Sequence, residues 1–246
     1  MRSHPSLSFG ALLACSGAML LFVCMAVSCN DVPSNRIVQQ EDARTLAVVS
    51  LRNGSKDGPA RLLDGTGNVR KEGHYVRDHK EGQWRTYDPQ GKMLEVLWYH
   101  EGTLHGTCTT FSADGNVVRA VNYAGGVLHG AFETYHPDGS IALRCIYANG
   151  SLNGHYFAYS TTDSLVRGPI TECWYEHGHR EGIWTRRYGN GQTSVVGMRH
   201  RDLQDGVWRY WDRAGNLKRI GYYRMGVRYR VVILRREEPW FLLPMG

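Results

Sequence analysis

The sequence lacks most of the residue patterns that mark an enzyme or a metalloprotein. It contains no glycine-rich phosphate loop opening a helix, no nucleophile elbow and no distinctive pair of carboxylates. His177 and His179 flank a glycine near Glu176 and Glu181, yet no cysteine pair at metal-ligand spacing accompanies them. We therefore expect a protein that is not an enzyme, with no catalytic residue, no metal ligand and no cofactor.

Cysteine is scarce beyond the N-terminal segment. Of the six cysteines, half fall before residue 30, and the remaining three are Cys108, Cys145 and Cys173. An odd number at unrelated spacings excludes a disulfide framework. Cys145 and Cys173 occupy equivalent positions of the repeat described below, where packing against neighbours predicts buried, inert thiols.

Long apolar runs are also absent, with one exception at the N-terminus. Arg2 precedes an almost wholly apolar run from Phe9 to Val27. A short basic region followed by an apolar run is typical of a secretory signal. The run ends in Ala-Val-Ser-Cys, which resembles a bacterial lipobox, although Ala26 stands where Leu is usual. We interpret residues 1–28 as a lipoprotein-type signal peptide and Cys29 as its lipidation site.

Two alternatives to lipidation remain open at this stage. The first is a plain secretory signal, cut after Ser16 or Ser28, which predicts a secreted protein. The second is an uncleaved anchor, because about 19 apolar residues suffice to span a bilayer.

The chain does contain an internal repeat. The stretch Tyr99–Asn122 is copied in the next 24 residues, and one glycine, here called the reference glycine, marks each unit. The reference glycines are Gly58, Gly82, Gly106, Gly130, Gly154, Gly182 and Gly206. They lie 24 residues apart, except where four extra residues enter near Thr161–Arg167. A fixed period of this length predicts a repeat architecture in which each unit packs on its neighbours.

Each unit contains two turn signals and two strand signals. Gly or Asp stands four places before the reference glycine, as in Gly102 and Asp202, and a second Gly stands nine places after it, as in Gly115. Both positions favour a left-handed backbone in a tight turn. Alternating apolar residues between the turns predict half-buried strands. We therefore predict an all-β fold, an elongated single antiparallel sheet of about seven stacked β-hairpins.

The repeat divides the chain into segments. Residues 29–48 are polar and rich in breakers, which predicts a flexible tether. Residues 49–230 form the repeat array. Residues 231–246 predict a last strand followed by an apolar cap, Pro239 to Pro244, over the exposed sheet edge.

Some residues are not explained by the repeat. Glu95, Arg119 and Arg219 occupy a slot that is apolar in other units. This predicts either a groove partly open to water or, as we expect, stems that lie along aromatic rings with the charged heads in water. Residues 161–167 predict an inserted loop, either a harmless lengthening or part of a binding face. The segment Arg199–Arg236 is strongly basic, which suits either an anionic partner or a solvated rim.

The repeat resembles a known family. The pattern Tyr-x-x-Gly-x-x-x-Gly-x-Trp, best seen in Tyr175–Gly191, is similar to the bacterial variant of the MORN repeat. The resemblance spans residues 51–229 and implies stacked β-hairpins in an open sheet. It also implies a relation to membrane-associated repeats, scaffolds and antitoxin-type repeat proteins, and it brings no catalytic residues.

These observations predict an exported, lipid-anchored protein facing the periplasm or the outer membrane. It would bind or scaffold a protein or another component of the cell envelope, and no nucleic acid. The alternatives are an antitoxin or immunity-type protein binder, a glycan- or lipid-binding module that uses the aromatic ladder as a platform, and a lipid- or glycan-processing enzyme built on the insertion. The aromatic ladder comprises the rings that recur seven places before and two and five places after the reference glycines, such as Tyr75, Trp84 and Tyr87.

Overall fold

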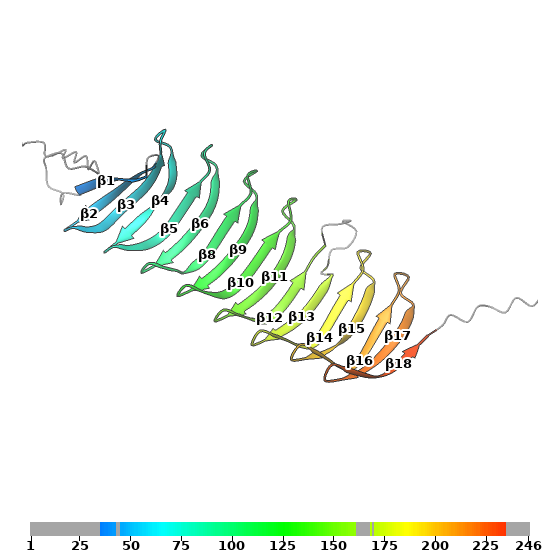
Figure 1. Ribbon diagram of the computed structural model, residues 1–246. Coiled ribbons are helices and arrows are strands. Elements are labelled where there is room, and N and C mark those ends of the chain that lie inside the picture. The colour runs from blue at the N-terminus through cyan, green and yellow to red at the C-terminus, as the bar shows by residue number, and fades with distance from the viewer. Residues whose placement is uncertain (1–34, 43–44, 161–167, 169, 235–246) are drawn as a thin grey trace, which may run out of the picture.

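The computed structural model describes residues 35–42, 45–160, 168 and 170–234 (Figure 1). The predicted signal peptide, Cys29, the insertion at 161–167 and the predicted cap at 239–244 lie outside the described residues.

The described chain is a single antiparallel sheet in which consecutive strands pair, apart from one strand, Met93–His100, that pairs with both Thr103–Leu104 and Gly106–Phe111 (Figure 1). It contains no helix, as the all-β prediction requires. The strands are β1 (Asn35–Asp42), β2 (Thr45–Arg52), β3 (Ser55–Asp64), β4 (Val69–Val76), β5 (His79–Tyr87), β6 (Met93–His100), β7 (Thr103–Leu104), β8 (Gly106–Phe111), β9 (Val117–Ala124), β10 (Val127–Tyr135), β11 (Ile141–Ala148), β12 (Ser151–Ala158), β13 (Thr171–Glu176), β14 (His179–Arg187), β15 (Thr193–His200), β16 (Leu203–Trp211), β17 (Leu217–Arg224) and β18 (Val227–Ile233).

The tether predicted for residues 29–48 is wrong over most of its length. β1 and β2 occupy this region and pair antiparallel, from Asn35 opposite Leu51 to Asp42 opposite Thr45. The β-branched pair Ile37-Val38 and the run Leu46–Val49 favour strands. Their signal is short, and the polar residues between them obscured it.

The two predicted turn positions are confirmed. The residue four places before each reference glycine has a positive φ, from +69° at Asp78 and Asp202 to +86° at Gly178. The residue before it is also left-handed, as at Glu101 (φ 48°), so both central residues of each hairpin turn have the backbone that type I′ turns need. The reference glycine also has a positive φ, and the register shifts beside it, as between Glu72 and His74 on β4. A bulge of this kind bends the strand and increases its twist.

Successive hairpins are joined at the tight turns by a repeated backbone hydrogen bond. The N–H of the second turn residue donates to a carbonyl in the preceding unit, as from Gly102 to Lys80 (2.9 Å) and from Asp202 to Arg180 (3.0 Å). Because this turn N–H finds its hydrogen-bond acceptor in the preceding unit, neighbouring repeats stabilise each other.

The core is a row of buried side chains on one face of the sheet. Trp84, Cys108, Cys145, Cys173 and Trp208 are all buried there. In most units side-chain size is matched across the hairpin, since a large ring two places after the reference glycine faces a smaller residue nine places before it. The units of Gly58 and Gly106 instead have Ala60 and Cys108 at the ring position. Gly197 lies so close to Trp208 that an added Cβ would stand 2.1 Å from the ring. In the part of the chain that the structure describes, no second layer covers the sheet, so this matching within the row replaces a central core.

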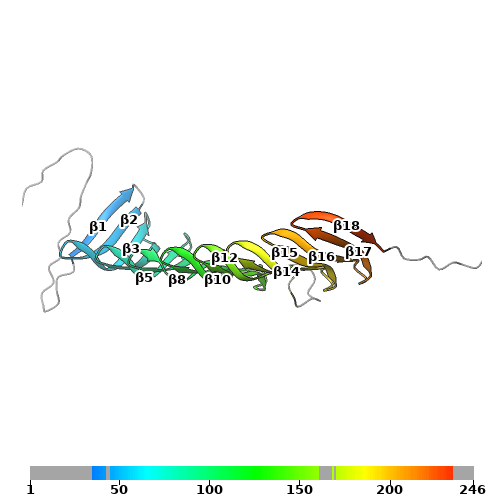
Figure 2. The ribbon, with the colours of Figure 1, turned by 90° about the horizontal axis from the view of Figure 1, so that it is seen from below.

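Seen from below, the array is long and one layer thick (Figure 2). Its two long borders are formed by turns, and its two ends are single strands, β1 and β18. Among the described residues there is no helix long and apolar enough to cross a membrane.

Candidate binding surface

The positive charge of the chain is concentrated at one end of the array. Between residues 199 and 234, on β15 to β18, nine cationic side chains accompany three carboxylates. This is a formal net charge of +6, equal to that of the whole chain, so the remaining residues balance to zero. We call residues 199–234 the basic end.

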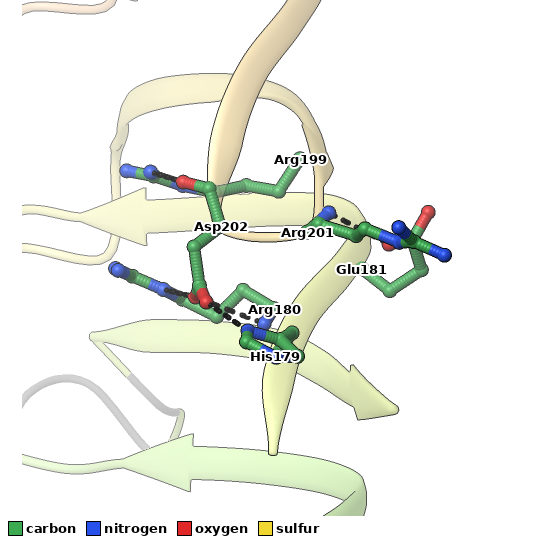
Figure 3. A network of polar contacts seen from close by, with 6 residues as sticks. All are labelled: His179, Arg180, Glu181, Arg199, Arg201 and Asp202. Carbon is green, nitrogen blue, oxygen red and sulfur yellow. Dashed lines mark hydrogen bonds and ion pairs between the residues drawn. The ribbon is translucent and has the colours of Figure 1, made fainter. Parts of the chain in front are cut away.

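The first of the three carboxylates, Asp202, lies in a tight turn and contacts His179 and Arg180 of the preceding repeat (Figure 3). Its Oδ1 accepts hydrogen bonds from the backbone N–H of Arg180 (3.0 Å) and from its Nε (2.9 Å), and its Oδ2 lies 2.7 Å from Nδ1 of His179. These donors hold the pKa of Asp202 far below its usual range. The same contact raises the pKa of Arg180. The Asp202 carboxylate therefore forms its ion pair with Arg180 of the preceding repeat, on β14, while the Asp202 backbone carbonyl accepts a hydrogen bond from Nη1 of Arg199.

The other two carboxylates are also engaged locally. Asp205 accepts from the backbone N–H of Met225 (3.1 Å). Asp212 accepts from the backbone of its own turn and lies 3.1 Å from Nζ of Lys218. Hydrogen bonds from Asn216 are the main reason that the pKa of Asp212 falls to about 2. In the part of the chain that the structure describes, the other cations of the basic end form no salt bridge.

Several of these cations lie on aromatic rings. The guanidinium carbon of Arg199 is 5.2 Å from the centre of Trp208 and 5.7 Å from that of Trp184, and that of Arg219 is 3.8 Å from Tyr210. Burial against the rings lowers the pKa of Arg199. Contacts of this type are favourable and hold the cation at the sheet surface. The expectation that the Arg219 stem lies along an aromatic with its head in water is wrong in one respect, because the guanidinium itself stacks on the ring.

Six cations of the basic end have exposed side chains. They are Arg201, Arg209, Arg213, Arg224, Arg228 and Arg230. Arg213 lies over Tyr188 (5.8 Å) and Arg230 over Tyr222 (5.3 Å). These guanidinium groups reach water from both the strands and the turns of the basic end.

Two rings of the aromatic ladder belong to the core, while others, such as Tyr156 and Trp184, are half-buried. Trp84 is 5 % exposed and Trp208 is 1 % exposed, and the indole N–H of Trp208 donates to the carbonyl of Met198 (3.1 Å). Rings this deeply covered offer no flat face to a sugar. Trp98 and Trp174 are more than 40 % exposed, but they lie at a different repeat position.

The other candidate residues from the sequence have structural partners. Cys145 and Cys173 are buried free thiols, as their repeat position predicts, and burial raises the pKa of each to about 11. His177 lies in a turn (φ 50°), and His179 pairs with Asp202. Among the described residues, no three His, Cys, Asp or Glu side chains are placed to bind a metal ion. Glu95 and Arg119 pair across the sheet with threonines and do not meet each other.

Comparison with known families adds one finding. Residues 80–100, 128–149 and 204–225 match a family model. The model is the MORN repeat variant. Each match begins two residues before a reference glycine, so all three have the phase of the 24-residue unit.

Three matches in one phase support a MORN-repeat family for this chain, in agreement with the sequence resemblance. MORN repeats are commonly binding or scaffold modules and are generally non-enzymatic. The third match lies within the basic end. A comparison with curated proteins finds no match.

The sequence indicated the basic end but not its organisation. The number of arginines can be read from the sequence. The contacts of the three carboxylates and the stacking of Arg199 and Arg219 on rings depend on the pairing register of the strands. One signal was available, since Arg199 occupies the position of the ladder tyrosines.

Proposed function

We propose that this protein is an exported, lipid-anchored MORN-like module that binds an acidic region of another protein at the cell envelope. The array acts as a scaffold, and the basic end is its contact surface. No catalytic step is part of this function.

One observation carries the proposal. The net charge of the chain lies on residues 199–234, while the three carboxylates there are used for turns and local contacts. The repeat does not require this charge, because the unit at residues 75–98 carries four cations and four carboxylates. A surface with one sign of charge steers an oppositely charged partner and raises its association rate, with an effect that salt screens.

Affinity capture with matched charge variants tests the binding function. The full chain carries Arg209→Gln, Arg213→Gln and Arg224→Gln in the test variant. The control carries Arg52→Gln, Arg77→Gln and Arg119→Gln, which removes the same charge from exposed positions elsewhere in the array. We expect the test variant to capture at least about tenfold less protein from native membranes than the control, because each removed charge weakens the electrostatic attraction of an acidic partner. Equal capture by both variants would refute the proposal.

Metabolic labelling tests the anchor separately. Bacteria that express the full chain are fed a labelled fatty acid, and the label is followed in wild type and in Cys29→Ala. The proposal requires label on the wild type that disappears in the variant. A wild-type chain without label, or a variant that keeps it, would exclude lipidation at Cys29 and favour a secreted or signal-anchored protein.

Vesicle sedimentation tests whether the acidic groups that the basic end binds belong to a protein or to lipid. If the basic end bound lipid instead of protein, the full chain without its N-terminal 29 residues would sediment with vesicles of phosphatidylglycerol. The proposal expects no such sedimentation at 150 mM salt, an ionic strength at which the Debye length is about 8 Å.

A further inference from the structure

The terminal strand β18 is the most exposed strand of the array. Val227, Tyr229 and Ile233 are 70 %, 66 % and 68 % exposed, and Val231 is 41 % exposed. Large apolar side chains are unusual at this exposure, and a cluster of them marks an interaction surface. The repeat pattern does not account for them, because β18 follows the last reference glycine and Arg230 stands where the next would fall.

β18 pairs on one side only. Six residue pairs join it to β17, from Arg224 opposite Val227 to Arg219 opposite Ile233. Among the described residues no strand pairs with its other side. Its unpaired N–H and C=O groups therefore form an edge of about 23 Å, at roughly 3.3 Å per residue over seven residues. The strand contains no proline, the residue that commonly blocks such an edge.

The positive charge beside this edge favours an acidic strand as its partner. β17 and β18 together carry Lys218, Arg219, Arg224, Arg228 and Arg230, and no carboxylate. A second copy of β18 in a centred antiparallel pairing would place Arg230 opposite its own equivalent, with Arg228 opposite Val232, and like charges opposite each other destabilise a sheet. A strand with carboxylates at these places would form favourable cross-strand pairs.

The chain's own C-terminal segment fits this edge poorly. Residues 235–246 contain two arginines and two glutamates, and so carry no net charge. Pro239 and Pro244 enclose only four residues that have an N–H to donate, against seven on β18.

We infer that β18 is a docking edge to which the partner adds an extended segment, as an extra antiparallel or parallel strand with acidic residues alternating with apolar ones. The inference rests on the proposed binding function and names its mode. Main-chain hydrogen bonds supply affinity, and side chains beside Arg228, Arg230, Val231 and Ile233 supply selectivity.

A synthetic peptide tests the inference on the full chain. The probe is a capped octapeptide of four alternating Glu-Ile pairs. One control has the same sequence with four backbone nitrogens methylated, two on each edge, and a second has Lys in place of Glu. Hydrogen exchange of residues 227–233 and fluorescence anisotropy of the labelled peptide are measured at low salt.

We expect the Glu-Ile probe to slow exchange in β18 at least about fivefold and to bind at least about tenfold more tightly than either control. The variant Arg228→Gln/Arg230→Gln should lose at least about tenfold in affinity, and the matched variant Arg52→Gln/Arg77→Gln should keep it. Equal binding of the methylated peptide would overturn the inference, because charge alone would then explain the contact.

Two other results would also overturn it. Binding of the probe only after removal of residues 235–246 would show that the chain's own tail holds the edge. A dimer in sedimentation, with β18 protected in the absence of peptide, would show that a second copy does. Either result, combined with continued capture of a protein by the basic end, would leave the proposed function standing and remove only this mode of binding.

Discussion

The substitution Gly197→Ala tests the size matching that replaces a central core. Gly197 is buried on β15, opposite Trp184 on β14, and its φ lies outside the left-handed region, so an added methyl group meets steric resistance only. An ideal Cβ would stand 2.1 Å and 2.3 Å from two ring atoms of Trp208. Ordinary contact begins near 3.4 Å. The indole must therefore move by more than 1 Å.

That movement has a calculable cost. Overpacking a well-packed site costs about 1–3 kcal/mol. Displacing Trp208 also breaks its hydrogen bond to the carbonyl of Met198, which contributes about 1 kcal/mol. We expect Gly197→Ala to lower the free energy of unfolding by about 2–4 kcal/mol, measured by urea titration with far-UV circular dichroism.

Two further variants make the test specific. Gly189→Ala is the control, because its Cβ would meet no atom within 4 Å and its φ is not left-handed. We expect it to change stability by less than about 0.5 kcal/mol. The pair Gly197→Cys/Trp208→Tyr recreates Cys145 and Tyr156 of an earlier repeat, and it should be more stable than Gly197→Cys alone by about 1 kcal/mol or more. A Gly197→Ala protein as stable as Gly189→Ala would refute the reasoning.

Two predictions concern titratable groups. Because burial raises the pKa of Cys145 and Cys173 to about 11, both thiols should resist alkylation in the folded chain at pH 8 and react on unfolding, as followed by peptide mass mapping; rapid reaction of either thiol in the folded chain would contradict their burial. Arg180 and His179 lower the pKa of Asp202 in the folded chain. The stability that the ionised Asp202 contributes to the fold is therefore fully present above pH 3.8, its ordinary pKa, and is lost as the pH falls through the lower pKa of the folded chain. Wild type should therefore exceed Asp202→Asn in stability by up to about 1 kcal/mol at pH 6, and the difference should shrink at pH 3; an equal difference at both pH values would contradict this assignment.

The sequence predicted the fold closely because the period assigns most residues a structural role. Gly102 and Gly115 predicted their turns, since few residues tolerate a positive φ. The period did not reveal β1 and β2, which precede the first full unit and whose strand signal is short. It also did not reveal the match of Gly197 with Trp208, because that contact depends on the bulge at the reference glycine.

The candidate binding surface was predictable only as a charge excess. The sequence places arginines near the C-terminus, but it does not tell which carboxylates neutralise them. Asp202 reaches back to Arg180 through a turn-to-turn contact 22 residues away, a distance that only the stacking of hairpins makes short. The open edge at β18 has the same origin, because exposure at the end of an array depends on where pairing stops.

An in-frame deletion tests the central claim, that each 24-residue unit is one self-consistent hairpin and that binding lies at the basic end. Removing residues 97–120 deletes one full unit and joins Val96 to Val121 in the same phase. Removing residues 97–108 deletes half a unit and puts every later residue out of phase. We predict that the 24-residue deletion keeps a cooperative urea transition and captures the same protein as wild type, while the 12-residue deletion loses both. Loss of the folded transition in the 24-residue deletion would contradict the account.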